Sequence, residues 1–453
     1  MSTLKKRVIH AGAWAMGGYA VGQFLRLASN LIITRFLVPS MFGVMSIVTT
    51  IMVGMVLFTD LGLRENVIQS PRGTDPVFLD TVWTIQILRG LLLWLLSVLI
   101  GLALHFAVQW GWVAAHTAYS DPILPWVIPV SALGVLFSAF EPTWTSTASR
   151  RLEQSKLTLI ELSSQLGGML VMLVWVLADR SIWALVIGGL TPTILRNVIV
   201  YRIIPGEPNH WHLESAAVRE VLQFGKWVFL ASIVGFMFMN GDRLLLGGMV
   251  TSHELGIYMV AFLIVYSINQ VVSRLVANVA FPAMSEAMRE GSEHFVRVYY
   301  RLRLFFDFGL LFMAGFLYEA GVWIVHLLYD SRYGGAGYML EILSLELIAL
   351  RYAMADRGFM AKGHTRIVSN LTMIRTLVLF VGLPLAYHRY GLAGGMWAIV
   401  ASYFASVPFS LYYKYKLQFL HPGKELYTLP VLLLGGGLGW LLSQVTLNWH
   451  WHH

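Results

Sequence analysis

Apolar stretches of about 20 residues recur along almost the whole chain, separated by short segments that carry most of its charge. A helix of that length crosses a hydrocarbon core roughly 30 Å thick. Because every backbone polar group must be paired inside that core, such continuous apolar stretches predict membrane-spanning helices. Only 12% of the residues are charged and 57% are hydrophobic, which excludes an ordinary soluble enzyme. The predicted fold class is an all-α, multi-pass membrane protein.

Hydropathy predicts six spans in each half of the chain and a thirteenth near its end. The first-half spans are predicted at residues 11–33, 42–63, 81–106, 123–146, 157–178 and 181–203. The later spans are predicted at residues 225–250, 255–280, 302–328, 337–360, 366–387, 391–413 and 427–446.

Two short motifs occur twice at one spacing, which indicates an internal repeat. Leu-Thr-Leu-Ile at 157–160 returns as Leu-Thr-Met-Ile at 371–374. Trp-Ala-Leu-Val at 183–186 returns as Trp-Ala-Ile-Val at 397–400, so the same spacing separates both pairs. Phe-Gly-Val at 42–44 has a looser copy, Leu-Gly-Ile at 255–257, at nearly that spacing. Matches in the same order at nearly one offset point to a duplicated unit.

An even number of spans in each copy makes the two halves parallel, so we expect two six-helix lobes around a central cleft. The corresponding domains are an N-terminal lobe at 1–212, a C-terminal lobe at 213–424, and an extra span with its tail at 425–453. The long loops at about 204–224 and 281–301 are predicted to lie on the membrane surface.

Basic residues in the loops predict the orientation. With the N-terminus in the cytoplasm, inside loops hold 21 of the 32 Lys and Arg residues and outside loops hold 4. This bias follows the positive-inside rule. The net charge of +8 is then mostly membrane anchoring, and no nucleic-acid partner is expected. The chain has no cysteine and no nucleotide-loop or metalloprotease motif, so we expect no enzyme activity, metal or cofactor.

Once the Lys and Arg residues close to a span end are counted with the loops, seven arginines and no lysine remain inside the predicted spans. They are Arg26, Arg89, Arg196, Arg243, Arg274, Arg351 and Arg375. Each costs about 2.5–3.5 kcal/mol at a helix centre, so it should face a cavity or a partner. A guanidinium stays charged and grips phosphate with a planar fork, which suits a phosphorylated anion.

Helical spacing places two of these arginines on polar stripes. The first stripe consists of Tyr19, Gln23, Arg26 and Asn30; the second consists of Tyr266, Gln270, Ser273, Arg274 and Asn278. We expect both stripes to line the cleft. The predicted substrate-binding residues are therefore Arg26, Arg274, Arg89, Arg243, Gln23, Asn30, Gln270, Arg351 and Arg375.

The alternative for each arginine is a structural ion pair. Arg243 beside Asp242, and Glu161 with Arg375, are the pairs we consider. The acids predicted to form ion pairs or to bind a coupling ion are Asp60, Glu161, Asp242 and Glu319.

Three segments resemble bacterial polysaccharide transporters. They are Phe58-Thr59-Asp60-Leu61-Gly62-Leu63, the stretch from Asp75-Pro76 through Gln86 to Arg89-Gly90, and Asn240-Gly241-Asp242-Arg243 with the residues to Gly247. These segments are similar to flippases for lipid-linked oligosaccharides in the multidrug/oligosaccharidyl-lipid/polysaccharide exporter superfamily. The likeness covers about residues 1–420, and the thirteenth span departs from the commonest pattern.

The resemblance implies that undecaprenyl pyrophosphate carrying a short sugar repeat is flipped across the bacterial inner membrane. It also implies a lipid bilayer around the protein and a polysaccharide polymerase as a partner. The alternatives are a multidrug or cation antiporter of the same superfamily, which would favour acids in the cleft, and a flippase for the peptidoglycan lipid precursor. A scaffold or polymerase is disfavoured by the short outside loops.

Overall fold

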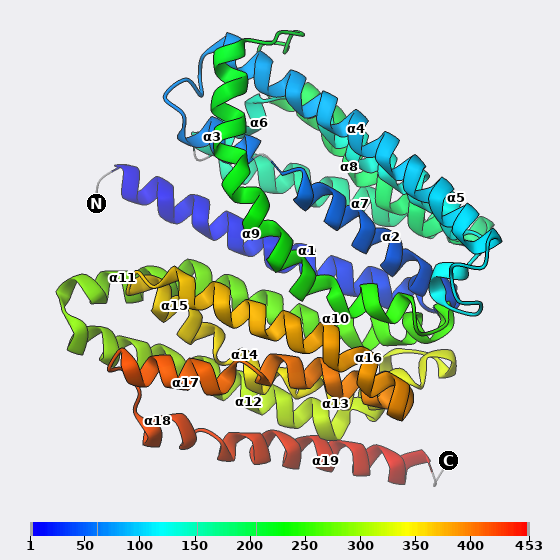
Figure 1. The fold of residues 1–453 in the computed structure, drawn as a ribbon, viewed down its shortest axis with the longest axis vertical. Helices are drawn as coiled ribbons and strands as arrows, with labels where there is room; N and C mark the ends of the chain where they lie inside the picture. The colour runs from blue at the N-terminus through cyan, green and yellow to red at the C-terminus, as the bar shows by residue number, and fades with distance from the viewer. Residues whose placement is uncertain (1–2, 61, 152, 205, 451–453) are drawn as a thin grey trace. The chain divides into compact units, whose positions relative to one another are not determined.

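The computed structural model describes residues 3–60, 62–151, 153–204 and 206–450, with the backbone alone at 3–9, 64, 65, 150, 222–232 and 445–450. Regular structure in these residues is helical throughout, without a strand (Figure 1). The chain divides into two compact units. Unit 1 is Met1–Phe236 with Gly247–His253, and unit 2 is Met237–Leu246 with Glu254–His453.

Unit 1 is built from eight α-helices, a short 3-10 helix and most of a ninth helix. They are α1 (Thr3–Ile33), α2 (Pro39–Phe58), α3 (Leu63–Gln69), α4 (Pro76–Gln109), η1 (Ala118–Ser120), α5 (Leu124–Ala139), α6 (Trp144–Arg150), α7 (Gln154–Ala178), α8 (Trp183–Ile203) and α9 (Ser215–Gly247). Helix α7 packs between α1 and α8, and α5 packs against α2, α4 and α8. The predicted lobe boundary at 212 precedes α9, whereas the division between units falls within α9.

Unit 2 contains the remaining helices. They are α10 (Ser252–Leu275), the π-turn η2 (Val276–Ala280), α11 (Phe281–Glu290), α12 (Ser292–Leu328), η3 (Ser331–Tyr333), α13 (Ala336–Ser344), α14 (Glu346–Leu350), α15 (Ala353–Ala361), α16 (Thr365–Phe404), α17 (Val407–Lys416), α18 (Pro422–Leu426) and α19 (Pro430–His450). Helix α12 packs against α11, α13, α14 and α19, and α16 packs against α13, α14, α15 and α17.

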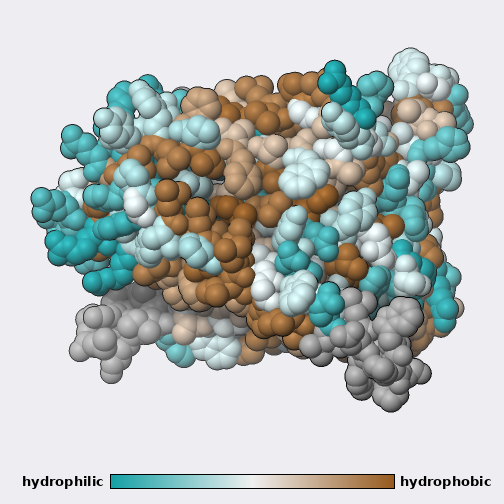
Figure 2. All heavy atoms as spheres, turned by 90° about the horizontal axis from the view of Figure 1, so that it is seen from below, coloured by the Kyte–Doolittle hydropathy of each residue, from teal (hydrophilic) through white to brown (hydrophobic). Residues whose placement is uncertain are grey.

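The predicted spans coincide with helices. Within the part of the chain that the structure describes, eight helices are long and apolar enough to cross a membrane, by length and composition. The spans predicted at 366–387 and 391–413 lie in α16 and α17, and Gly391 at φ 63° interrupts α16 between them. The span predicted at 337–360 is broken into α13, α14 and α15. Figure 2 shows a face on which hydrophobic side chains gather between more hydrophilic ends. The protein is an all-α, multi-pass membrane protein.

Proline and aspartate mark where the long helices of unit 1 begin. Pro39 and Pro76 occupy the first positions of α2 and α4, where a missing backbone N–H costs no hydrogen bond. The Asp75 carboxylate caps α4 by accepting a hydrogen bond from the Val77 N–H at 3.1 Å.

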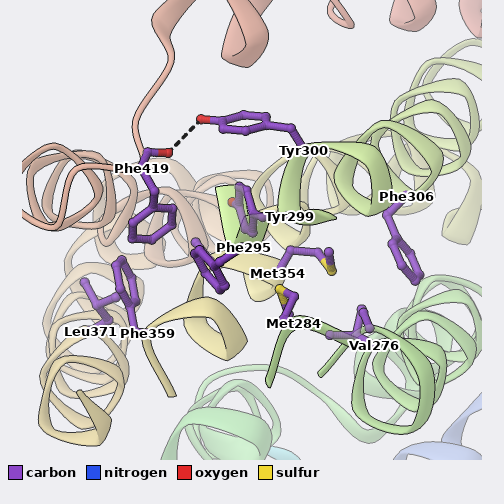
Figure 3. Close-up of a cluster of buried hydrophobic side chains, with 12 residues drawn as sticks. Val276, Met284, Phe295, Tyr299, Tyr300, Phe306, Met354, Phe359, Leu371 and Phe419 are labelled. Carbon is purple, nitrogen blue, oxygen red and sulfur yellow. Dashed lines mark hydrogen bonds between the residues drawn. The ribbon is translucent and has the colours of Figure 1, made fainter. Parts of the chain in front are cut away.

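An aromatic cluster forms the core at one end of unit 2 (Figure 3). The rings of Phe295 and Tyr299 on α12 and of Phe359 on α15 each meet the ring of Phe419, after α17, edge to face. The Tyr300 hydroxyl donates a hydrogen bond to the Phe419 carbonyl at 3.1 Å. Edge-to-face contact of this kind adds to the burial of the rings, so this cluster fixes α15 and the α17–α18 connection against α12.

The thirteenth predicted span is α19, and glycines bring it into backbone contact with α12. A Cβ atom on Gly435 would lie 2.0 Å from the Phe312 carbonyl oxygen, and one on Gly315 would lie 2.0 Å from that of Leu432. A Cβ atom on Gly439 would lie 2.7 Å from the Phe316 oxygen. Small residues permit such close approach of membrane helices. Helix α19 is thus an integral part of unit 2.

The segment before α9 is strapped to α4 inside unit 1. The Glu214 N–H donates to the Thr81 hydroxyl at 3.1 Å, and the Asn209 amide donates to the Asp80 carboxylate at 3.2 Å. Arg72 forms ion pairs with Glu214 at 2.6 Å and with Asp75 at 2.8 Å. The Arg72 guanidinium, through its hydrogen bond, holds the pKa of the Asp75 carboxyl below its usual range. We call residues 206–214 the strap.

Candidate functional site

The first polar stripe lies on α1, which packs against α7. Gln23 is buried, and the Arg26 side chain is exposed without an ion-pair partner among the described residues. Gly22 allows close approach, because a Cβ atom there would lie 3.1 Å from the Gln165 side-chain oxygen on α7. Asn30 on the same stripe is half-buried. The Arg26 side chain is therefore accessible to an anion, whereas Gln23 is buried.

Glu161 of α7 belongs to an ion-pair group inside unit 1. Arg196 of α8 contacts Glu161 at 3.1 Å and Glu141 at 2.8 Å. Gln165 donates a further hydrogen bond to Glu161 at 2.9 Å. The single arginine is thus shared by two carboxylates. The sequence did not predict this pairing, because the partners lie on three separate segments.

Arg89 and Asp60 line a pocket of about 330 Å³ in unit 1. Arg89 lies on α4 and donates from Nε to the Thr59 hydroxyl at 2.9 Å and from Nη2 to the Val56 carbonyl at 2.6 Å. The Asp60 carboxylate accepts the Gly62 N–H at 3.0 Å, just after α2 ends. The structure thus brings together two residues that the sequence predicted for different roles.

In unit 2, Asp242 and Arg243 form the ion pair that the sequence analysis considered. Arg243 Nε lies 3.5 Å from Asp242 Oδ1, and the Arg243 guanidinium stacks 4.5 Å from the centre of the Phe262 ring. Asp242 is buried and accepts a hydrogen bond from the Tyr258 hydroxyl. Glu346, which is also buried, contributes a second carboxyl to this region. The arginine is therefore anchored by one carboxylate and one aromatic ring.

The second polar stripe lies on α10. Gln270 donates a hydrogen bond to the hydroxyl of Tyr266 one turn earlier, which keeps the two side chains on one face. Arg274 follows one turn later near the end of α10 and is exposed. The spacing predicted from the sequence is thus present on a regular helix as far as Leu275, whereas Asn278, the last residue of the stripe, lies in the π-turn η2.

Arg375 is held by partners within unit 2. It forms an ion pair with Asp356 of α15 at 3.2 Å and donates from Nε to the Ser406 hydroxyl at 2.6 Å. The sequence-based pair between Arg375 and Glu161 was wrong in its partners, because each residue pairs inside its own unit. The counterpart of this ion pair in unit 1 joins Glu161 to Arg196.

Arg351 lies in a buried charge network that connects α12, α17 and α18. Its guanidinium donates to Asp307 Oδ2 at 2.6 Å and to the Glu425 carbonyl at 2.7 Å, and its side chain is 2% exposed. Arg303 contacts Asp307 at 3.2 Å and Glu425 at 2.5 Å, and Lys414 pairs with Glu425. These contacts make Arg351 part of a structural ion-pair network, which is the alternative to substrate binding that the sequence analysis gave for each arginine.

Glu319 lies on α12 beside α19. It is exposed and lines a mostly apolar pocket of about 550 Å³ with Tyr318, Leu432 and Trp440. No basic partner for it occurs in the part of the chain that the structure describes. Within the described residues, no group of three or more potential ligands could hold a metal ion.

The buried network was missed for two reasons. Arg303 lies at the start of the span predicted at 302–328 and was not counted among the arginines inside the spans, whereas α12 already begins at Ser292. The signal that could have revealed it is the spacing of Arg303 and Asp307, one turn apart on one helix face. Glu425 carries no such local signal, since its partners lie on α12 and α17.

Comparison with known proteins places the chain in a family. A sequence model described as "Polysaccharide biosynthesis protein" matches residues 32–337, which is more than half of the chain. The chain belongs to this family. The match includes the second polar stripe and the Asp60–Arg89 pocket, whereas the first stripe on α1 precedes it.

Two curated proteins align with this member of the polysaccharide biosynthesis family. One is the lipopolysaccharide biosynthesis protein WzxC of Escherichia coli K12, 22% identical over 295 residues, or 63% of this chain and 56% of WzxC. The other is an uncharacterized membrane protein in the cps region of Klebsiella pneumoniae, 22% identical over 287 residues, with the same shares. The chain thus spans little more than half the length of these relatives.

Solved structures show the same fold at low identity. The lipid II flippase MurJ in an inward closed conformation is 12% identical with a TM-score of 0.69, over 96% of this chain and 99% of MurJ. An inward-facing MATE multidrug transporter of the MOP superfamily is 12% identical with a TM-score of 0.60, over 88% and 94%. A MOP superfamily transporter from Pyrococcus furiosus is 14% identical with a TM-score of 0.54, over 91% and 96%.

Proposed function

We propose that this protein is a flippase that moves an oligosaccharide linked to a polyprenyl pyrophosphate from the cytoplasmic to the periplasmic leaflet by alternating access. The observation that carries this proposal is the family match over residues 32–337, joined to the arginines in the membrane helices. The names of WzxC and MurJ, one a lipopolysaccharide biosynthesis protein and the other a lipid II flippase, support the same kind of substrate.

In this proposal Arg26 and Arg274 contact the pyrophosphate. Both side chains are exposed and lie on polar stripes, whereas Arg243, Arg351 and Arg375 are buried or half-buried. A guanidinium can grip two phosphate oxygens at once, and that bidentate contact is stronger in a membrane protein's interior than in water. The remaining arginines then shape the protein around the site.

Loss of both arginines tests the site. We expect the double variant Arg26→Ala, Arg274→Ala to reach the membrane in normal amount but to abolish export of surface polysaccharide in cells that lack their own copy. Arg389→Ala is the matched control, since this arginine is exposed and lies at a predicted outside turn. Normal polysaccharide in the double variant would overturn the site assignment.

The orientation can be tested directly because the chain has no cysteine. We propose a cytoplasmic N-terminus in the bacterial inner membrane. A single cysteine at Ala115 should then react with a membrane-impermeant maleimide added to intact spheroplasts. A cysteine at His212 in the strap should react only after the membrane is opened. The opposite pattern would show that the orientation is inverted.

The second candidate is a multidrug or cation antiporter of the superfamily. Asp242 and Glu346, two buried acids in unit 2, are the observation that favours it, because a cation binder needs carboxylates. Deletion of an antiporter would raise sensitivity to cationic drugs and leave polysaccharide export intact. Deletion of the proposed flippase would remove the polysaccharide and accumulate its lipid-linked repeat.

A further inference from the structure

A polar pocket of about 330 Å³ lies inside unit 1, where α2 and α5 end beside α4. Its polar lining is made by Asp60, Gln86, Arg89, Ser138 and Glu141, and its other lining residues are apolar or small. Ligand pockets in proteins commonly measure about 300–1,000 Å³. The volume is therefore at the lower limit for a small ligand and fits one ring of a larger molecule.

The donors of this pocket are fixed in place. Gln86 donates from its amide nitrogen to the carbonyls of Ala139 at 3.0 Å and Glu141 at 3.1 Å. Arg89 donates to Val56 and Thr59 at the end of α2. The carbonyls of Val56, Ala139 and Glu141 and the Thr59 hydroxyl hold these two side chains where α2 and α5 end. Groups fixed in this way lose little entropy when a ligand binds.

Charge decides what kind of ligand the pocket suits. Asp60 and Arg89 place one carboxylate and one guanidinium at the lining, and the Glu141 carboxylate is paired with Arg196 at 2.8 Å. The lining therefore has no excess positive charge to hold a pyrophosphate. Hydroxyl groups suit this lining, because a carboxylate accepts from an O–H and a guanidinium donates to its oxygen. Asp60 uses Oδ1 for the Gly62 N–H, while Oδ2 has no hydrogen-bond partner among the described residues.

We propose that this pocket binds one sugar ring of the transported oligosaccharide and contributes to the choice of repeat unit. The proposal rests on the proposed function and assigns the sugar to a different place from the pyrophosphate. Asp60 and Glu141 accept hydrogen bonds from neighbouring sugar hydroxyls, and Arg89 donates to a hydroxyl oxygen. The carboxylates that balance the positive charge of the arginines are the groups that recognise the sugar.

The test compares two lipids on the purified full chain in nanodiscs. One is undecaprenyl pyrophosphate without sugars, and the other is the sugar-bearing lipid extracted from a strain that lacks the flippase. We expect Asp60→Asn, which keeps Oδ1 as an acceptor, to weaken binding of the sugar-bearing lipid about tenfold. Binding of the bare lipid should change less than twofold. Glu207→Gln in the exposed strap is the matched control and should change neither.

Each outcome separates the sugar proposal from the proposed function. If the wild-type chain binds neither lipid, the flippase function fails. If it binds both lipids equally, or if Asp60→Asn weakens both equally, the sugar site is overturned while the flippase function stands. Ser138→Leu, which places bulk at the exposed rim of the pocket, gives a second variant should Asp60→Asn fail to fold. It should also weaken the sugar-bearing lipid selectively, and equal loss of both lipids would refute the site.

Discussion

The buried network of unit 2 should depend far more on its carboxylates than on its lysine. Among the described residues it contains three cations, Arg303, Arg351 and Lys414, against two carboxylates, Asp307 and Glu425. Removing one partner of a buried ion pair costs about 3–5 kcal/mol, because a charge is left uncompensated. Removing the cation in excess leaves two arginines facing two carboxylates. The network therefore predicts a large loss of stability when Glu425 is replaced and a small one when Lys414 is replaced, although these two side chains contact each other.

Glu425→Ala is the strongest perturbation. The Glu425 side chain accepts hydrogen bonds from Arg303 at 2.7 Å, from Tyr300 at 2.9 Å and from Lys414. Its loss strands two buried cations, so we expect unfolding of unit 2 to become easier by about 3–5 kcal/mol. For a unit of about 200 residues this lowers the melting temperature by about 10 °C, by the scale for soluble domains.

Lys414→Met keeps an unbranched apolar side chain in the same space. Since Lys414 is the cation in excess, its replacement leaves both carboxylates paired with arginines, and we expect a loss below about 1 kcal/mol. Glu290→Gln removes an exposed carboxylate that lies 3.4 Å from His294, and should change stability by less than about 0.5 kcal/mol. Intrinsic tryptophan fluorescence during heating of the detergent-solubilised protein measures all three. Equal melting temperatures for Glu425→Ala and Lys414→Met would refute the charge-balance argument.

Close contacts elsewhere in the chain predict three further outcomes. Gly435→Leu should detach α19 from α12 and lower the yield of folded protein, because even a Cβ atom there would lie 2.0 Å from a carbonyl oxygen. Gly437→Leu is the control and should leave the yield unchanged, because a Cβ atom at Gly437 meets no atom within 4 Å. Asn209→Ala should speed amide hydrogen exchange of the strap by removing its contact with α4. The Arg72–Asp75 contact should protect the strap above about pH 4, the ordinary carboxyl pKa, and lose that protection as pH falls through the lowered pKa of Asp75. Protection that stays equal from pH 7 down through the full titration of Asp75 would contradict it.

The positions of the membrane helices could be predicted from the sequence because apolar length is a local property. The predicted span at 337–360 shows the limit of that reasoning. Its hydropathy is continuous, but the structure breaks it into three helices around Arg351. The guanidinium there reaches Asp307, which lies on a different helix, α12. Hydropathy records how apolar a segment is and carries no information about such a partner.

The candidate site was predictable only in part for a related reason. Periodicity placed Gln270 and Arg274 on one stripe, and both lie on the regular helix α10. It could not identify which neighbouring helix each charge meets. Arg243 was paired correctly because its acid is adjacent in sequence, whereas Glu161 and Arg375 were paired wrongly because their acid and base partners lie on other helices.

The internal repeat relates the observed ion pairs of Glu161 and Arg375 to each other. Glu161 and Arg375 occupy equivalent positions in the two copies of the Leu-Thr-x-Ile motif, yet carry opposite charges. Each is neutralised inside its own unit, Glu161 by Arg196 and Arg375 by Asp356. An ion pair is therefore anchored at the same place in both copies, with its polarity reversed. Such a pair stabilises each unit irrespective of which partner is the acid. The charge of Arg375 is therefore accounted for without an anionic ligand. Arg375 is then not needed among the pyrophosphate contacts, and that role falls to Arg26 and Arg274, which the double variant tests.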